Sequence, residues 1–120
     1  MATVDLTAAD FERTVTENEI VLVDFWASWC GPCRMFAPIY DSVSDAHADI
    51  VFARVDTEAE QELAAAARIA SIPTLMAFKQ GTLVFSQPGA LPAAALEQLV
   101  AAVWDLDVDK ARADVEQRSA

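Results

Sequence analysis

Cysteine, glycine, histidine and basic side chains are all scarce in this sequence. Its 120 residues include two cysteines, three glycines, one histidine and 8 basic residues against 19 acidic ones. The net charge of −11 argues against a nucleic-acid partner and against an anionic membrane surface, because both attract clustered Lys and Arg. No apolar run approaches the roughly 18 residues that a membrane-spanning helix needs.

The N-terminal segment MATVDLTAADFERTV has neither the basic stretch nor the apolar stretch of a secretory signal peptide. We therefore expect a cytoplasmic protein, in a compartment where thiols are kept reduced. Apolar residues make up 54% of the chain, so it can bury the core of one domain without disulfide bridges.

Four segments have the composition of β-strands. Residues 20–27 and 50–56 are almost continuously apolar, which is typical of strands buried on both faces of a parallel sheet. Residues 74–79 and 82–87 flank a Gln-Gly dipeptide at 80–81. That pattern predicts an antiparallel hairpin with a two-residue turn.

Helices are expected between and after these strands. Capping-box patterns at 7–10 and 57–60 predict the starts of two helices. A third helix is expected from Cys30, and a last one from Pro92.

This order of elements predicts an α/β fold, with a mixed central sheet of four to five strands flanked by four helices. A short edge strand is expected at residues 3–5. After Trp104 the apolar stripe of the last helix weakens. We therefore expect residues 1–104 to form the domain and residues 105–120 to form a charged helical extension or tail.

The two cysteines, Cys30 and Cys33, lie in the segment DFWASWCGPCRM. As a structural clip, their disulfide would close a short loop and contribute at most about 2 kcal/mol. As metal ligands they would need further partners, and the single histidine, His47, lies in a polar stretch that predicts an exposed helix end. A reaction centre is therefore the favoured interpretation of the pair.

The position of the pair at a strand-to-helix junction favours thiol chemistry. Cys30 would lie at the helix N-terminus, where backbone N–H groups and the helix dipole stabilise a thiolate. Cys33, one turn further on, would be placed to resolve a mixed disulfide. Gly31 would let the chain turn tightly, and Pro32 would fix the backbone of the first turn.

Asp24 interrupts the apolar strand that leads to the cysteines. Burial of a carboxyl without a partner is costly and raises its pKa. Such a group behind a thiol pair is suited to act as general base for the second cysteine. A partly solvated aspartate near a strand end is the alternative interpretation.

Together these residues resemble the thioredoxin family. Four motifs, in the family's order, carry the resemblance, which covers roughly residues 4–104. The motifs are VDFWASWCGPCRMFAP at 23–38, SIPTL at 71–75, FKQG at 78–81 and PGAL at 88–91. The resemblance implies the thioredoxin fold, with Cys30 as the attacking thiolate, Cys33 as the resolving thiol and Asp24 as the buried proton acceptor.

The resemblance also implies a flat apolar groove that receives the substrate beside the cysteines. Trp29, Ile72, Pro73, Thr74 and Gly89 match the family positions that form it. The bond before Pro73 is expected to be cis, which would turn the backbone of Ile72 toward the cysteines. An extended substrate could then pair with that backbone.

The implied activity is that of a protein disulfide reductant, with Gly31 and Pro32 between the cysteines as in the reducing members of the family. The protein would bind no cofactor. It would act as a monomer on disulfide-containing proteins and receive electrons from NADPH through a flavoprotein thioredoxin reductase. The alternative is a non-catalytic binding or chaperone module of the same fold.

Several residues depart from the family's common pattern. Arg54 stands where a lysine usually neighbours the aspartate, and an arginine cannot lose its proton. Arg68 and Ser71 replace common glycines, and Pro88 replaces a usual β-branched residue. These differences bear on the choice of partner more than on the chemistry.

Overall fold

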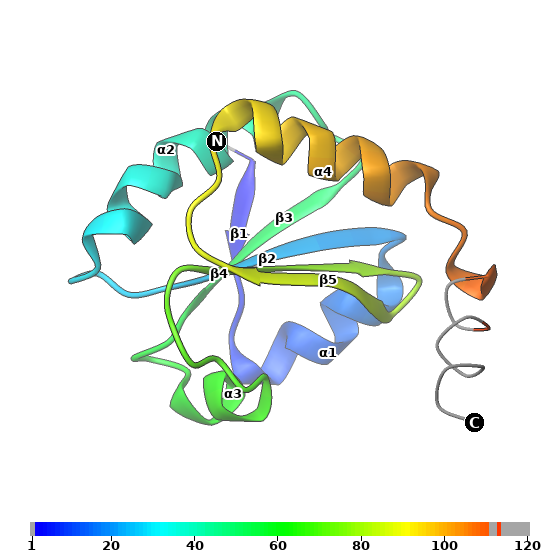
Figure 1. Ribbon diagram of the computed structural model, residues 1–120. Helices are drawn as coiled ribbons and strands as arrows, with labels where there is room; N and C mark the ends of the chain where they lie inside the picture. The colour runs from blue at the N-terminus through cyan, green and yellow to red at the C-terminus, as the bar shows by residue number, and fades with distance from the viewer. Residues whose placement is uncertain (1, 111–112, 114–120) are drawn as a thin grey trace.

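A five-stranded sheet forms the centre of the computed structural model, which describes residues 2–110 and 113 (Figure 1). The strands follow the order β1–β3–β2–β4–β5. The first three are parallel to one another, β4 is antiparallel to β2, and β5 is antiparallel to β4. Their bounds are β1 (Thr3–Asp5), β2 (Ile20–Trp26), β3 (Val51–Asp56), β4 (Thr74–Lys79) and β5 (Thr82–Pro88). The predicted mixed sheet is therefore confirmed.

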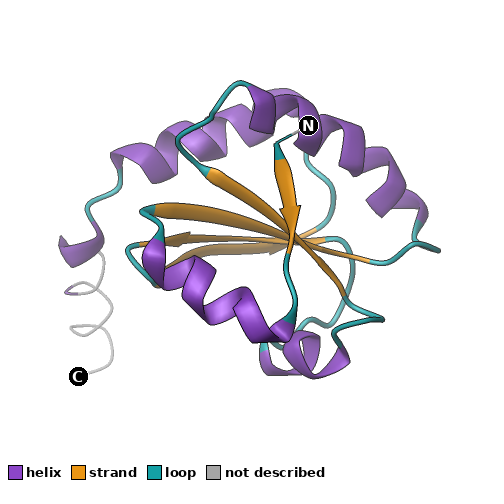
Figure 2. Ribbon diagram, turned by 180° about the vertical axis from the view of Figure 1, so that it is seen from behind, coloured by secondary structure: helices purple, strands orange, loops and turns teal. Residues whose placement is uncertain are grey.

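Two helices cover each face of the sheet, as the views from both sides show (Figures 1 and 2). On one face lie α2 (Gly31–Asp45) and α4 (Ala93–Asp105). On the other lie α1 (Ala8–Glu17) and α3 (Gln61–Ala66). The four predicted helices are present.

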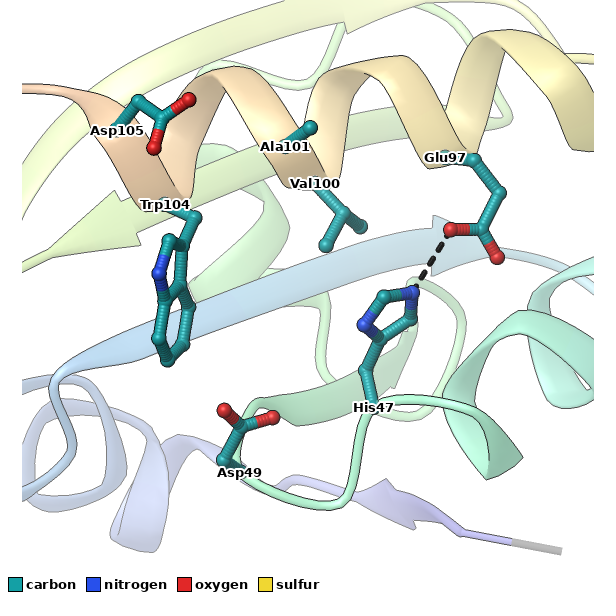
Figure 3. Close-up of a pocket in the computed structure, with 7 residues that line it drawn as sticks. All are labelled: His47, Asp49, Glu97, Val100, Ala101, Trp104 and Asp105. Atoms are coloured by element: carbon teal, nitrogen blue, oxygen red, sulfur yellow. Dashed lines mark hydrogen bonds and ion pairs between the residues drawn. The ribbon is translucent and has the colours of Figure 1, made fainter.

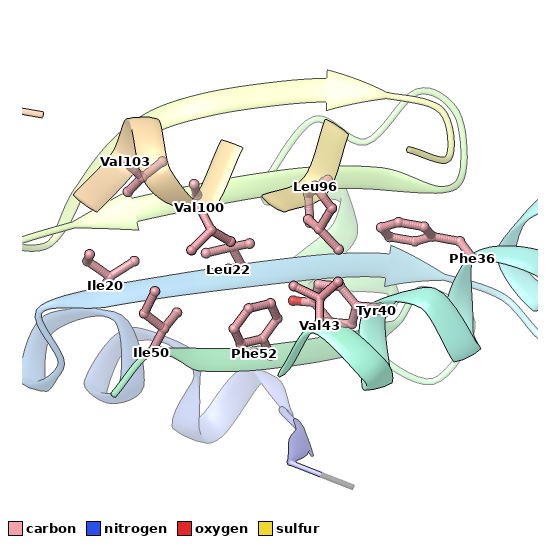
Figure 4. Close-up of a cluster of buried hydrophobic side chains, with 12 residues drawn as sticks. Ile20, Leu22, Phe36, Tyr40, Val43, Ile50, Phe52, Leu96, Val100 and Val103 are labelled. Atoms are coloured by element: carbon pink, nitrogen blue, oxygen red, sulfur yellow. The ribbon is translucent and has the colours of Figure 1, made fainter. Parts of the chain in front are cut away.

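The larger apolar cluster lies between the sheet and the pair α2 and α4 (Figure 4). It contains fully buried aromatic rings from two elements, Phe36 and Tyr40 of α2 and Phe52 of β3. Ile20 and Leu22 supply its floor from β2. Because side chains alternate along a strand, the next residue of β2 on this face is Asp24.

Of the two predicted capping boxes, the one at α1 forms and the one at α3 does not. At the start of α1, Oδ1 of Asp10 accepts a hydrogen bond from the backbone N–H of Thr7 at 2.7 Å, as predicted. Before α3, the hydroxyl of Thr57 instead donates to the carbonyl oxygen of Trp26 at 3.0 Å, and the N-cap is Glu60. Because α3 begins only at Gln61, Thr57 lies too far before the helix to be its N-cap.

The hairpin turn is the predicted two-residue turn. Gln80 and Gly81 both have positive φ, 53° and 74°. Both central residues of a type I′ turn need that conformation, which matches the twist of the flanking strands.

A buried lysine holds the C-terminal end of α4. The Nζ atom of Lys79 donates to the carbonyl oxygens of Val103, Trp104 and Leu106 at 2.8, 2.7 and 2.8 Å. The Val103 carbonyl also accepts from the backbone N–H of Leu106 at 3.2 Å. The ammonium group therefore supplements the backbone donors at this helix end, where the last carbonyls lack their usual helical partners. Beyond α4, Val108 is also buried, and most of the predicted 105–120 extension lies outside the described residues.

Candidate active site

Cys30 and Cys33 form a disulfide at the junction of β2 and α2. Cys30 is the N-cap of α2, as predicted, and its Sγ accepts a hydrogen bond from the backbone N–H of Cys33 at 3.2 Å. The two Cα atoms are 5.2 Å apart. The first turn of the helix therefore directs its N–H groups and the positive end of its dipole at the Cys30 sulfur.

The proposed reason for Gly31 is wrong. Its φ is not positive, and a Cβ added there would meet no atom within 4 Å. The turn into α2 therefore does not require a glycine. Pro32 lies in the first helical turn, where its missing N–H leaves no hydrogen bond unmade.

Asp24 is fully buried, and neither carboxylate oxygen has a hydrogen-bond partner among the described residues. Burial raises the pKa of Asp24 from its ordinary value of 3.8 to about 6, and the positive charge of Arg54 partly opposes that rise. The predicted upward shift is thus present. Asp24 points to the face of the sheet that α2 covers, the helix that carries the nearly fully buried Cys33.

Arg54 is the ionic neighbour of Asp24. The two residues are paired in the register of β2 and β3, and Nε of Arg54 lies 3.7 Å from Oδ2 of Asp24. The guanidinium also stacks over the ring of Trp26, with Cζ 4.3 Å from the ring centroid. These contacts keep a permanent positive charge beside the buried carboxyl.

Tyr40 is a further group near Asp24 that sequence reasoning missed. Its hydroxyl donates to the carbonyl oxygen of Ala53 at 2.9 Å. Complete burial, with the charge of Asp24 second, raises the pKa of Tyr40 well above its ordinary range, so this group stays neutral. In the sequence, Tyr40 reads only as one more apolar position of a helix.

The predicted groove residues gather on the other side of the disulfide. Trp29 is 64% exposed, and its indole N–H donates to Glu58. The Ile72–Pro73 bond is cis, and the carbonyl oxygen of Ile72 lies 3.7 Å from Sγ of Cys30. Gly89 has a φ of 103°, and its N–H donates to the carbonyl oxygen of Pro73 at 2.7 Å.

Thr74, predicted as part of the groove, is buried rather than exposed. Its hydroxyl donates to the carbonyl oxygen of Ser71 at 2.6 Å and so holds the loop before the cis bond. Beside Trp29 and Ile72 lies a cavity of about 400 Å³, bounded further by Thr57 and Ser71. Thr57 and Glu58 were not expected here, because their sequence reads only as the start of a helix.

Within the described residues, no group of three or more His, Cys, Asp and Glu side chains is arranged to hold a metal ion. In residues 2–110 and 113, no helix has the length and apolar character required to cross a membrane.

Comparisons with known proteins agree with this geometry. The model of the family described as Thioredoxin matches residues 2–102. A putative thioredoxin 2 from Streptomyces coelicolor is 51% identical over 119 residues, which is 99% of this chain and 89% of that protein. A thioredoxin from Alicyclobacillus acidocaldarius is 43% identical, over 85% of this chain and 98% of that protein.

Two solved structures extend the comparison to the fold. A mutant thioredoxin from Halobacterium salinarum superposes with a TM-score of 0.79 at 30% identity, covering 88% of this chain and 92% of the other. A thioredoxin from Plasmodium falciparum gives a TM-score of 0.75 at 37% identity, covering 82% of this chain and 95% of the other.

Proposed function

This chain belongs to the thioredoxin family, and we propose that it acts as a monomeric reductant of protein disulfides in the cytoplasm. The family match and the Cys30–Cys33 pair make it a thiol–disulfide oxidoreductase with disulfide reductase activity. The role of each residue, the electron donor, the monomeric state and the compartment are the proposed parts.

The reaction begins with the reduced pair. The Cys30 thiolate attacks one sulfur of the substrate disulfide, forms a mixed disulfide with it and releases the other substrate sulfur as a thiolate. The position of Cys30 at the N-terminus of α2 supports this role, because the helix stabilises the negative sulfur.

Cys33 completes the reaction. Its thiolate attacks the Cys30 sulfur, which forms the Cys30–Cys33 disulfide and releases the second substrate thiolate. Two electrons have then passed from the pair to the substrate. Asp24 accepts the proton of the Cys33 thiol, and its raised pKa places it near the pH of the cytoplasm, as a general base requires.

The oxidised pair must be reduced again for turnover. Members of the family generally carry no bound cofactor, so the electrons come from outside the chain. The proposed donor is NADPH, acting through a flavoprotein thioredoxin reductase.

The surface beside Cys30 is suited to an extended substrate. Trp29 supplies an exposed aromatic face, and Ile72 presents a backbone carbonyl next to the Cys30 sulfur. A polypeptide could hydrogen-bond to that carbonyl as an added strand while its own sulfur meets Cys30. Pro73 and Gly89 hold the two loops that border this surface together.

The observation that carries the proposal is a cysteine pair at a helix N-terminus above a buried carboxyl with a raised pKa. The test is reduction of a protein disulfide in the presence of NADPH and thioredoxin reductase. The reaction is monitored as the loss of NADPH absorbance. Turnover is expected for the natural chain and none for Cys30→Ser. The variant Cys33→Ser should instead accumulate a mixed disulfide that mass spectrometry detects.

A variant without either cysteine separates the proposed reductant from a binding module. A module that only binds would keep its role in cells after both cysteines are replaced by serine. A reductant would lose it.

A further inference from the structure

A cavity of about 280 Å³ lies at the end of the sheet opposite to the cysteines. Cys30 follows the carboxyl end of β2, whereas Asp49 precedes the amino end of the parallel strand β3. His47 and Asp49, in the loop between α2 and β3, form one wall of the cavity, and the C-terminal half of α4 forms the other (Figure 3). The cavity is therefore separate from the groove that we propose for disulfide substrates.

Figure 3 shows how the side chains surround the cavity. Trp104 and His47 stand on opposite sides, Val100 lies between them on α4, and Asp49 lies below. The Trp104 side chain is 52% exposed and offers the face of its indole ring. Its ring therefore provides apolar surface that the described part of the chain leaves uncovered.

His47 has a different role from the predicted one. It is not a freely exposed helix-end residue, because Nε2 lies 2.8 Å from Oε2 of Glu97 and the ring stacks on Phe52. The contact ties the loop after α2 to α4 and so fixes the width of the cavity. It also occupies the carboxylate of Glu97.

Two carboxylates at the cavity have no such partner. In the part of the chain that the structure describes, Asp49 and Asp105 form no ion pair and accept no side-chain hydrogen bond. Asp105 lies on the side of Trp104 away from His47 (Figure 3). Among the residues that the structure describes, the two carboxylates that line the cavity with Trp104 are thus without a cation.

We propose that this cavity receives an arginine side chain of a partner protein. A cation over an indole face is attracted by the negative ring face, and a guanidinium can stack there flat while its N–H groups donate to carboxylates. Asp49 and Asp105 supply those acceptors, and the charge of the site complements a positive ligand and repels an acid. The proposal does not depend on the redox chemistry of the cysteines.

The size of the cavity favours a side chain over a free small molecule. Pockets that enclose drug-sized ligands usually measure about 300–1,000 Å³ and bury most of the ligand. This cavity of about 280 Å³ is at the lower end of that range and does not enclose its contents, because Trp104 remains 52% exposed. One long side chain, carried by the surface of another protein, fits it better.

The test is a titration of the full chain with the peptide acetyl-Gly-Arg-Gly-amide. Binding is monitored through the NMR signal of the Trp104 indole N–H. The signal is assigned by its absence in Trp104→Phe. The matched peptide with citrulline in place of arginine has the same shape without the charge. We expect saturable shifts at millimolar arginine peptide, weaker binding of the lysine peptide, and none of the citrulline peptide.

Variants locate the site. Trp104→Leu and the double variant Asp49→Asn with Asp105→Asn should each weaken binding of the arginine peptide by about fivefold or more. Glu62→Gln removes the same charge from an exposed position on α3, remote from the cavity, and should leave binding unchanged. Disulfide reduction by all of these variants should equal that of the natural chain, and their thermal unfolding shows whether each is folded.

Three results would overturn the proposal. They are the absence of any shift of Trp104 with the arginine peptide, equal binding of the citrulline peptide, and equal loss of affinity in Glu62→Gln. An equal loss of affinity in Glu62→Gln would mean that the peptide responds only to the net charge of the protein and not to this cavity. None of these results would affect the assignment as a disulfide reductant.

Discussion

Arg54 and Asp24 are cross-strand neighbours on β3 and β2, and Nε of the arginine lies 3.7 Å from Oδ2 of the aspartate. The pair sets the acidity of the buried carboxyl by two opposed effects. Burial raises the pKa of Asp24, and the charge of Arg54 lowers it, with a net value of about 6. Because an arginine does not titrate, its contribution persists at every physiological pH.

Replacing Asp24 by asparagine should stabilise the protein in a pH-dependent way. The folded pKa of about 6 exceeds the ordinary 3.8, so the folded state binds the proton more tightly and loses stability as pH rises through this window. The difference corresponds to about 3 kcal/mol. Asp24→Asn should therefore gain up to about 3 kcal/mol well above pH 6 and nothing below pH 4.

Urea unfolding of both proteins across this pH range checks the prediction. Asp5→Asn, at an exposed position, serves as the control and should give no such pH-dependent gain. A gain for Asp24→Asn that is the same at all pH values would mean that the Asp24 pKa is not raised.

Replacing Arg54 by methionine should raise the Asp24 pKa further, because the opposing charge is removed. If Asp24 accepts the Cys33 proton, the pH at which the mixed disulfide resolves at half its maximal rate should rise as well. Stopped-flow measurement of that rate against pH gives the midpoint. Arg54→Lys keeps a positive charge, so its midpoint pH should lie between those of the natural chain and Arg54→Met. An identical pH profile for all three proteins would show that Arg54 does not affect the pKa of Asp24.

Replacing Lys79 by methionine should destabilise the fold. The change keeps the apolar stem but removes the ammonium donor from three carbonyl oxygens at the end of α4, of which Val103 retains the Leu106 N–H. We expect a loss of about 2–4 kcal/mol in the free energy of unfolding, measured with denaturant. Lys110→Met, at an exposed position, is the control, and equal stability of the two variants would contradict the role given to Lys79.

Replacement by alanine should affect the stability of the protein differently at two glycines. Gly31 has no positive φ and has open space around it, so Gly31→Ala should leave stability unchanged or raise it by up to about 1 kcal/mol. Gly89 has a φ of 103°, so Gly89→Ala should cost about 1–3 kcal/mol. Thermal unfolding of both variants decides the matter, and a larger loss for Gly31→Ala would be the contrary result.

Sequence reasoning succeeded where local pattern and burial agree. The apolar runs of β2 and β3 and the Gln80–Gly81 turn specify their strands and hairpin directly. It failed where a polar group has a partner distant in sequence. The Thr57 hydroxyl donates to a carbonyl of β2 rather than capping α3. His47 forms its hydrogen bond with Glu97, which lies 50 residues away in the sequence. No local signal contains such contacts.

The candidate site divides in the same way. Cys30, Cys33 and Asp24 are conspicuous because thiols and a buried carboxyl are unusual on an apolar strand and the helix that follows it. Tyr40 and Glu58 are not, because a tyrosine in an apolar helix stripe and a glutamate on a loop are ordinary. Only the packing of α2 on β3 brings the Tyr40 hydroxyl near Asp24.

The most direct test of the reductant is the midpoint potential of the Cys30–Cys33 pair, measured by equilibration in thiol–disulfide buffers, alkylation and mass spectrometry. We predict a midpoint more reducing than the cytosolic glutathione pool, which extraction places at roughly −220 to −260 mV. A midpoint well on the oxidising side of that pool would contradict the account, because the pair would then form disulfides rather than reduce them.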